Sequence, residues 1–387
     1  MYHINPQNPK EMKTLTLRAT FIVLLSFLYL VGCRKSESDT EQLSPSIQQT
    51  IRATVAGTVV DESNKPLAGV KVEIDGQSTT TDFTGTFLLN KIYMSASRCA
   101  VKFTYPGYYM GVKCFTPKSD RSNFVKVVLI KKQAPYSFNA TTGITIILPN
   151  GTTIILPANG YVTASGSTYT GMVNASVYHL TPDDPNFGLK IPGGDLLGID
   201  LSGNKKVLQS YGMINVELTD NNGNQLQIAP GKTATLKYAI ALSQLSSAPN
   251  SMPHWFYNEK TNLWNEEGTI TRNGNFYETT VSHFTWWNCD YPYGLARIQG
   301  KVFFCNNIPA AFVLVTFSNG YVLTTDMNGQ YDVIFPANLS LTCQVLASNN
   351  NGVINNSPIV TIPALSIGQI YNVPDLNIPC PTLVKGR

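Results

Sequence analysis

An internal repeat limits what this chain can fold into more strongly than any other feature of its sequence. Three motifs occur near the beginning and recur, in the same order, near the end. Nine residues separate the leading glycine from the proline in both copies, and 25 or 26 residues separate it from the aspartate. The two copies comprise Gly57-Thr58-Val59-Val60, Pro66-Leu67-Ala68-Gly69-Val70-Lys71-Val72 and Thr81-Asp82-Phe83-Thr84-Gly85-Thr86-Phe87, and then Gly300-Lys301-Val302-Phe303, Pro309-Ala310-Ala311-Phe312-Val313-Leu314-Val315 and Thr325-Asp326-Met327-Asn328-Gly329-Gln330-Tyr331. We therefore expect one folding unit to occur twice.

Each copy has the pattern of a small β unit. A strand that carries a glycine is followed by a proline loop, a strand of alternating valines, and an Asp-x-x-Gly turn into an aromatic strand. In this turn Asp82 can accept hydrogen bonds from backbone N–H groups, while Gly85 supplies a positive φ. Asp326 and Gly329 have the same places in the second copy.

The rest of the chain also has the alternating pattern of β-strands. Apolar and polar residues alternate in residues 55–60, 70–74 and 124–130, between closely spaced turn signals. Asn150-Gly151 lies between two isoleucine-rich runs, which is a strong β-hairpin signal. Amphipathic helical patterns do not extend beyond about two turns. The sequence therefore predicts an all-β protein.

The repeat resembles the carboxypeptidase regulatory-like domain, which is a seven-stranded transthyretin-like sandwich. The resemblance implies two such modules, at residues 51–132 and 296–380, and a module of this family has no catalytic residues of its own. Phe312 stands where the first copy has Gly69, so the conformation of the second proline loop is an open question.

Residues 136–293 form a predicted central β-sandwich domain of another kind. Its opening segments, around Gly143 and Pro157, resemble the sandwich of zonula occludens protein and netrin receptors. Later landmarks are Pro192-Gly193-Gly194 and a tryptophan-rich stretch. The set is similar to the domain that accompanies regulatory-like repeats in surface proteins of Bacteroidetes-type bacteria and, more distantly, in cartilage intermediate layer protein. The predicted architecture is thus three β-sandwiches in tandem.

The N-terminal segment predicts export. Fourteen mostly apolar residues lie between Arg18 and Cys33, too few to span a bilayer comfortably, since a membrane helix needs roughly 20. The small residue before Cys33 resembles the lipobox of bacterial lipoproteins, which implies acylation of that cysteine, for example with palmitate. We therefore expect a signal peptide at 1–33, a polar tether at 34–50, and attachment to either face of a bacterial outer membrane. An ordinary signal peptide and an uncleaved anchor are the alternatives, and Met1 and Met12 are both candidate starts.

Charge and cysteine usage fit an exported protein. Only 13% of the residues are charged, and without residues 1–32 the net charge is about +2, so we expect no nucleic-acid partner. Six cysteines remain after Cys33, an even number that favours disulfides in an oxidising compartment. Cys99 and Cys114 flank a predicted turn and could pair across a hairpin. The remaining four allow three connectivities: Cys289, Cys305, Cys343 and Cys380.

Catalytic motifs are not apparent, and we expect neither a metal nor a cofactor. His254 and His283 lie near tryptophans in sequence, and Asp290 follows. These three residues suggest an alternative function, an envelope hydrolase, if they converge in an open pocket. The simpler interpretation makes the histidines structural donors in an aromatic core. Asp183, Asp184 and Asp195 are expected to be solvated loop acids.

Four tryptophans form the strongest candidate ligand site. Trp255, Trp264, Trp286 and Trp287 fall within 33 residues, and exposed aromatic rings form platforms for sugars and peptides. Packing in the core is the competing interpretation, because alternation sends Trp286 and Trp287 to opposite faces of a strand. The sequence therefore predicts a non-enzymatic envelope protein that acts as a scaffold or as an adhesion module for glycans or proteins.

Overall fold

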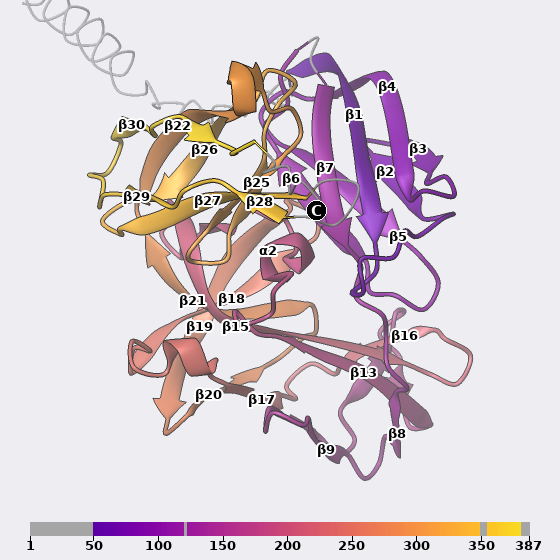
Figure 1. Ribbon diagram of the computed structural model, residues 1–387. Helices are drawn as coiled ribbons and strands as arrows, with labels where there is room; N and C mark the ends of the chain where they lie inside the picture. Colours follow the sequence, from indigo (N-terminus) through magenta and orange to yellow (C-terminus); the bar gives the residue numbers. More distant parts are fainter. Residues whose placement is uncertain (1–48, 120–121, 349–353, 381–387) are drawn as a thin grey trace, which may run out of the picture. The chain divides into compact units, whose positions relative to one another are not determined.

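A computed structural model describes residues 49–119, 122–348 and 354–380 (Figure 1). Cys33, the predicted signal peptide and nearly all of the predicted tether lie outside the described residues. Helices in the described part are limited to α2 (Phe187–Lys190) and the short 3₁₀ turns η1 (Leu242–Gln244) and η2 (Cys305–Asn307). The remaining elements are strands, which confirms the prediction of tandem β-sandwiches.

The first seven strands form two facing sheets. One has the order β4-β1-β7 and the other β3-β2-β5-β6. The strands are β1 (Thr50–Val60), β2 (Lys71–Ile74), β3 (Gln77–Thr80), β4 (Thr86–Ser95), β5 (Cys99–Thr104), β6 (Gly111–Phe115) and β7 (Ser122–Val128). A core that includes Val55, Val72 and Phe103 fills the space between the sheets. We call this part the first module.

The next fourteen strands belong to one continuous sheet, which we call the central domain. They are β8 (Tyr136–Asn139), β9 (Ile144–Ile147), β10 (Thr153–Leu156), β11 (Tyr161–Thr163), β12 (Thr168–Tyr169), β13 (Met172–Leu180), β14 (Leu197–Ile199), β15 (Lys205–Thr219), β16 (Gln225–Ile228), β17 (Ala234–Ala239), β18 (Ser251–Asn258), β19 (Leu263–Asn273), β20 (Phe276–Val281) and β21 (Trp286–Tyr293). β9 and β10 pair antiparallel around Gly151, whose φ is +85°, so the predicted Asn-Gly hairpin is confirmed.

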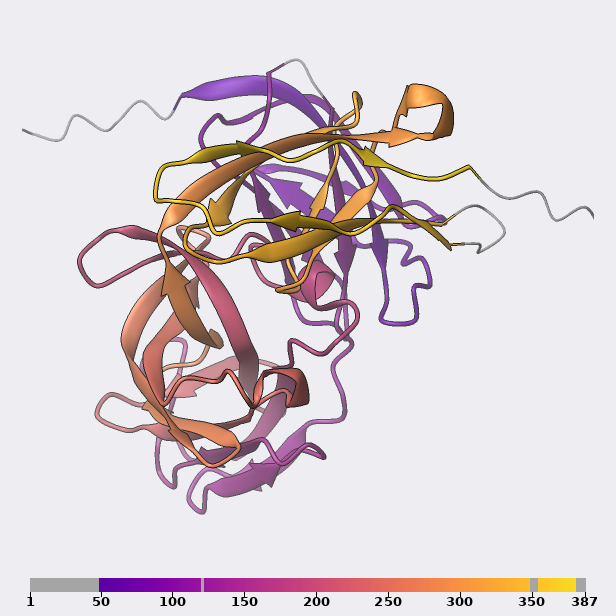
Figure 2. The ribbon, with the colours of Figure 1, turned by 60° about the vertical axis from the view of Figure 1, so that its left-hand side comes forward.

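The last ten described strands form a third module with two sheets. β22 lies between β26 and the pair β30 and β31, and β24 lies between β25 and β27. In Figure 2 the strands of this module are coloured from orange to yellow. The strands are β22 (Leu295–Phe304), β23 (Ile308–Pro309), β24 (Leu314–Phe317), β25 (Val322–Thr324), β26 (Gln330–Pro336), β27 (Leu341–Ser348), β28 (Ile354–Asn356), β29 (Val360–Ile362), β30 (Ile370–Asn372) and β31 (Leu376–Asn377). As in the first module, the entry strand pairs in parallel with the exit strands.

The repeated glycines are required by close packing. Gly57 lies opposite Phe87 in the β1–β4 ladder, and a Cβ atom on Gly57 would lie 2.6 Å from the Phe87 ring. Gly300 lies opposite Tyr331 in the β22–β26 ladder, and a Cβ there would lie 2.5 Å from the Tyr331 hydroxyl. In each copy an aromatic ring thus packs against a glycine, where a side chain would not fit.

The Asp-x-x-Gly turns adopt the predicted geometry. In the described part of the chain, five aspartates each accept hydrogen bonds through Oδ1 from the backbone N–H groups two and four residues further on, at 2.8 to 3.0 Å. These hydrogen bonds help to lower the pKa of three of the carboxyls, Asp82, Asp200 and Asp220. The five residues are Asp61, Asp82, Asp200, Asp220 and Asp326; Asn64, with φ +61°, follows Asp61 at the position where the other four turns have glycine. The same turn therefore closes loops in all three parts of the protein.

The second proline loop keeps the conformation of the first despite its substitution. Gly69 has φ +76°, and Phe312 has φ +58°, so both lie in the left-handed region. This conformation is costly for a residue with a Cβ. The Phe312 ring lies 5.2 Å from the ring of Phe124 on β7, centroid to centroid. The unusual residue thus forms a contact between the first and third modules.

Candidate functional site

The three residues of the hydrolase hypothesis do not converge. His254 on β18 pairs with Cys289 on β21 and is buried. Asp290 is the next residue of β21, so its side chain lies on the opposite face of the sheet. His283 precedes β21, and its Nε2 lies 3.3 Å from Glu267 Oε2 at the surface. The proposed cluster is therefore wrong, because strand alternation separates Asp290 from His254, and His283 lies beside Glu267 at the surface.

His254 is a buried residue of the aromatic core. Its Nε2 lies 2.8 Å from the hydroxyl of Tyr238, and its ring stacks on Trp287 at a centroid distance of 4.6 Å. Burial lowers the pKa of His254 to about 3, so the ring is neutral at physiological pH. A neutral histidine in a closed aromatic core has no access to a substrate.

Asp290 belongs to a separate buried network. Asn288 Nδ2 donates to Asp290 Oδ2, and Ser210 Oγ donates to Asn288 Oδ1 at 2.7 Å. Burial raises the pKa of Asp290 well above its ordinary value. This carboxyl thus lies on the face of the sheet opposite His254.

The four tryptophans are core residues and do not form an exposed platform. Their exposed fractions are 0% for Trp255, 1% for Trp264, 7% for Trp286 and 1% for Trp287. Trp287 faces the main core of the central domain, while the other three face a second core on the other side of the sheet. This second core also contains Tyr109 and Val112, so the tryptophans join the central domain to the first module. The predicted ligand platform is wrong for this reason.

The predicted pairing of Cys99 with Cys114 is also wrong. Cys99 lies opposite Phe115 and Cys114 lies opposite Ala100, so the two thiols project from opposite faces of the same sheet. Burial raises the pKa of Cys99 to about 12 and that of Cys114 to about 11. Both thiols are therefore protonated and poorly reactive at neutral pH.

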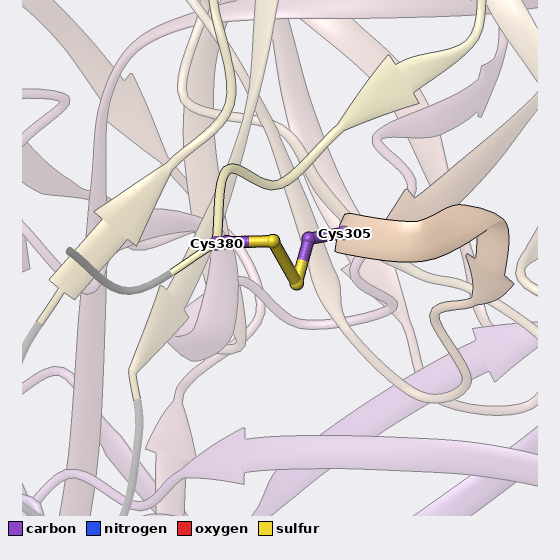
Figure 3. The surroundings of a disulfide bond; sticks show 2 residues. All are labelled: Cys305 and Cys380. Carbon is purple, nitrogen blue, oxygen red and sulfur yellow. A yellow bond between two sulfur atoms is a disulfide. The ribbon is translucent and has the colours of Figure 1, made fainter. Parts of the chain in front are cut away.

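One disulfide joins Cys305 to Cys380 (Figure 3). The Cα atoms are 5.0 Å apart, and 75 positions separate the residues in sequence. Cys289 and Cys343 are free and buried. The structure therefore contains one of the two bonds in one of the three possible connectivities, Cys305–Cys380. This disulfide lies in the third module.

Charged residues at the boundary between the first module and the central domain form a polar junction. Arg98 donates two hydrogen bonds to the Asp195 carboxylate and a third, at 2.9 Å, to the backbone oxygen of Asn262. Asp195 is therefore an ion-pair partner and not the solvated loop acid that we expected. A guanidinium suits this place because its planar fork matches a carboxylate.

Lys113 is the most deeply buried charge of this junction. Its Nζ donates to the backbone oxygens of Gly188 at 2.9 Å and Ile191 at 3.1 Å. The neighbouring backbone extends the contact, because Cys114 N donates to Gly193 O at 2.9 Å. Burial lowers the pKa of Lys113 to about 7. The side chain thus ties β6 to the loop around α2.

A second cation bridges the same two parts. Lys190 Nζ, at the end of α2, donates to Glu62 Oε1 at 3.0 Å, Asp184 Oδ2 at 2.6 Å and the Tyr178 hydroxyl at 3.1 Å. Glu62 comes from the first module, so this network also crosses the boundary. Asp184, expected to be a solvated acid, is engaged as well.

The sequence analysis missed this junction. Lys113 alternates with Val112 and Cys114 and therefore has the pattern of a solvent-facing strand residue. Arg98 and Lys190 stand in short polar surroundings without a motif. The one available signal was the Gly193-Gly194 pair before Asp195, where both glycines have φ +76° and a Cβ on Gly194 would lie 3.1 Å from Lys113 Cδ.

The third module contacts this junction from another side. Gly320 lies against Phe187 of α2, since a Cβ there would meet the ring at 2.7 Å. Lys118 Nζ lies 3.9 Å from Asp326 Oδ2. Together with the Phe124–Phe312 pair, these contacts connect the third module to the first module and to α2 of the central domain.

The described residues contain no cluster of three or more histidine, cysteine, aspartate or glutamate side chains that could hold a metal ion. Within the same ranges, no helix has the length and apolar character needed to cross a bilayer. The junction is built from backbone carbonyls, paired charges and packed indoles, and its chemistry is that of adhesion between modules.

Residues 54–129 match the family model of the carboxypeptidase regulatory-like domain. This match covers the first module, so the predicted resemblance to this family is confirmed for the first copy of the repeat. Such a domain is consistent with a non-catalytic surface module.

Cartilage intermediate layer proteins are similar to a larger part of the chain. Cartilage intermediate layer protein 2 of Homo sapiens is 29% identical over 238 residues, which are 58% of this chain and 20% of that protein. Cartilage intermediate layer protein 1 of Sus scrofa is 30% identical over 113 residues, 29% of this chain and 18% of that protein. The chain thus spans about a fifth of the length of the curated relatives it matches.

Among solved structures, the major pilin subunit BcpA of Bacillus cereus covers 85% of this chain with all of its own length, at 11% identity and a TM-score of 0.18. The Bacillus anthracis TIE protein covers 84% of this chain and 50% of its own, at 14% identity and a TM-score of 0.19. These TM-scores are too low to support an inference about function.

Proposed function

We propose that this chain is a non-enzymatic, lipid-anchored scaffold of a bacterial envelope. Cys33 carries the lipid, residues 34–50 form the tether, and the β-sandwiches are held as one body beyond it. The junction is the observation that carries the proposal. Lys113, Arg98 and Lys190 are used, with three tryptophans, to fasten the modules together.

The choice of a scaffold over an enzyme is supported by where the chemically interesting side chains lie. His254 and Asp290 are buried on opposite faces of a sheet, and the free thiols have raised pKa values. The Cys305–Cys380 disulfide supports an oxidising compartment, which the envelope provides. The match of residues 54–129 to a regulatory-like domain is in keeping with a display role.

Any glycan or protein ligand must use exposed side chains, since the tryptophans are buried. Large apolar side chains project at turn tips: Phe83 is 88% exposed, Leu201 76% and Leu242 82%. Phe83 and Leu201 directly follow the aspartates of two Asp-capped turns, which hold them rigidly. We propose these tips as contact points for a protein or glycan partner.

Fatty-acid labelling tests the anchor. Cells expressing the wild-type chain or Cys33→Ala are grown with radiolabelled palmitate, and the immunoprecipitated protein is counted. The proposal expects label in the wild type and none in Cys33→Ala. Equal label in both, or a soluble wild-type chain with residues 12–32 still attached, would contradict it. Protease treatment of whole cells then distinguishes outward from inward display.

A glycan array tests the ligand part separately. The purified wild-type protein is compared with Phe83→Ser and Leu201→Ser, which change exposed tips without entering a core. Binding that either variant reduces supports recognition through the tips. Binding that neither variant changes would refute the tips as contact points, while absence of any binding would leave a pure scaffold.

A further inference from the structure

We propose that the first module is built to carry tension along its β1–β7 ladder, and that the Cys305–Cys380 disulfide removes the chain between these two cysteines, in the third module, from the load path. This inference rests on the proposed anchored scaffold only for the source of the load. The mechanical property itself follows from the topology of the strands.

The first module is loaded in shear when its ends are pulled apart. The chain enters through β1 and leaves through β7, and these strands are parallel neighbours. Seven register pairs join them, from Thr54 opposite Ser122 to Val60 opposite Val128. A pull on the start of β1 and the end of β7 acts at opposite ends of this ladder. All its hydrogen bonds are then strained together, whereas unzipping would break them one by one.

The third module repeats this arrangement with a shorter ladder. The chain enters through β22 and leaves through β30 and β31, which are both parallel to β22. Three register pairs join β22 to β30 and two join it to β31. By strand pairing alone, this copy would therefore resist tension less well than the first.

The disulfide lies where this weaker ladder ends. Cys305 directly follows β22, and Cys380 follows β31 by three residues (Figure 3). Tension that arrives at Cys380 passes through the sulfur atoms to Cys305 and then along β22 to its start at Leu295. The chain between the two cysteines is bypassed and cannot be extended while the bond is intact.

The connection to the central domain continues this load path. Gly294 alone separates β21 from β22, so force leaves the third module directly into a central strand of the large sheet. β21 pairs there with both β15 and β18. The first module has no such bypass, since Cys99 and Cys114 are on opposite faces of their sheet. Its resistance depends on the β1–β7 ladder.

Optical-tweezers experiments on the mature chain, with one handle in place of Cys33 and one after Arg387, test the bypass. The sequence separation of 75 corresponds to about 25 nm of extended chain. We expect the total released length to be about 25 nm shorter for the oxidised protein than for the protein reduced with dithiothreitol. The Cys305→Ser/Cys380→Ser variant should release the longer length without reductant, and Cys343→Ser, which removes a free buried thiol, should behave like the wild type. Equal lengths in oxidised and reduced wild type would overturn the bypass, even if the double variant failed to fold.

A change of pulling direction tests the shear ladder. Force is applied to the first module either through β1 and the end of β7, or through β1 and a handle inserted in the connection that precedes β7. The second geometry pulls both strands from the same end and unzips them. We expect a several-fold higher rupture force in the first geometry, because forced unfolding reports the barrier along the pulled direction. Equal rupture forces would refute the proposal. Both readouts are independent of palmitate labelling, so failure of the anchor and failure of the mechanics can be distinguished.

Discussion

Replacement of Lys113 with methionine tests the view that folding buries this lysine between the first module and the central domain. Burial lowers the pKa of Lys113 from 10.5 to about 7. At about 1.4 kcal/mol per pKa unit, this shift corresponds to about 5 kcal/mol of unfolding free energy. Between pH 7 and 10.5 the unfolded chain binds the proton more tightly than the folded chain does. The free energy of unfolding therefore rises with pH in this window, and below pH 7 the contribution is constant.

The assay is urea unfolding of the wild type and Lys113→Met at several pH values. Methionine fills a similar volume but has no charge to lose, so the difference between the two proteins isolates the lysine. From pH 7.5 to 9.5 we expect this difference to change by about 3 kcal/mol in favour of the wild type. Lys71→Met, at an exposed lysine that pairs with Glu73, controls for the loss of a charge in general. A pH-independent difference between wild type and Lys113→Met would refute the reasoning.

Three further predictions concern single contacts. His254 has a pKa of about 3 in the fold against 6.5 when free, so the unfolding free energy should fall by about 2 kcal/mol between pH 6.5 and 4.5. The acid titration of His254→Gln should lack this part, and an identical slope in both proteins would contradict the prediction. Arg98→Ala leaves Asp195 without its partner and should lower the free energy of unfolding in urea by about 3 kcal/mol. Arg98→Lys should have an intermediate stability because lysine cannot form the second hydrogen bond to the carboxylate. Equal stability of Arg98→Ala and the wild type would contradict the prediction. Phe312→Ala and Phe312→Gly both lose the contact with Phe124, but only the glycine variant relieves the strain of the left-handed backbone. The glycine variant should therefore be more stable than the alanine variant by about 1 kcal/mol in thermal unfolding. The reverse order of stability would exclude backbone strain at this position.

Local patterns were sufficient to predict many elements of the fold. The Asn150-Gly151 hairpin and the Asp-x-x-Gly turns follow from residues that are neighbours in sequence, and the structure contains both. The glycines of the repeat could be recognised, but their packing partners could not. That Gly57 faces Phe87 depends on the register between two strands, which the turn between them does not determine alone.

The candidate site was the least predictable part. Alternation correctly sent Trp286 and Trp287 to opposite faces, yet it could not show that both faces are covered. One face of the central sheet meets its own core and the other meets the first module. A strand that is buried on both sides offers no exposed platform, whatever its aromatic content.

The same limitation explains the cysteines and the lysine. Cys99 and Cys114 are close along a hairpin, but a register offset of one residue places their side chains on opposite faces. Lys113 has the sequence pattern of a solvated strand residue and becomes buried only because Gly188 of α2 and Ile191, which follows the helix, supply carbonyl oxygens.

By itself, the amino-acid sequence determined that the chain forms strands, where the turns close, and that one unit is repeated, because each of these depends on residues a few positions apart. The tertiary structure alone decided which polar and aromatic side chains meet. Those contacts join residues up to about 210 positions apart, such as Lys118 and Asp326. Burial at a junction also depends on the surfaces of both partners. A local sequence pattern describes only one of these surfaces and does not show which other segment packs against it.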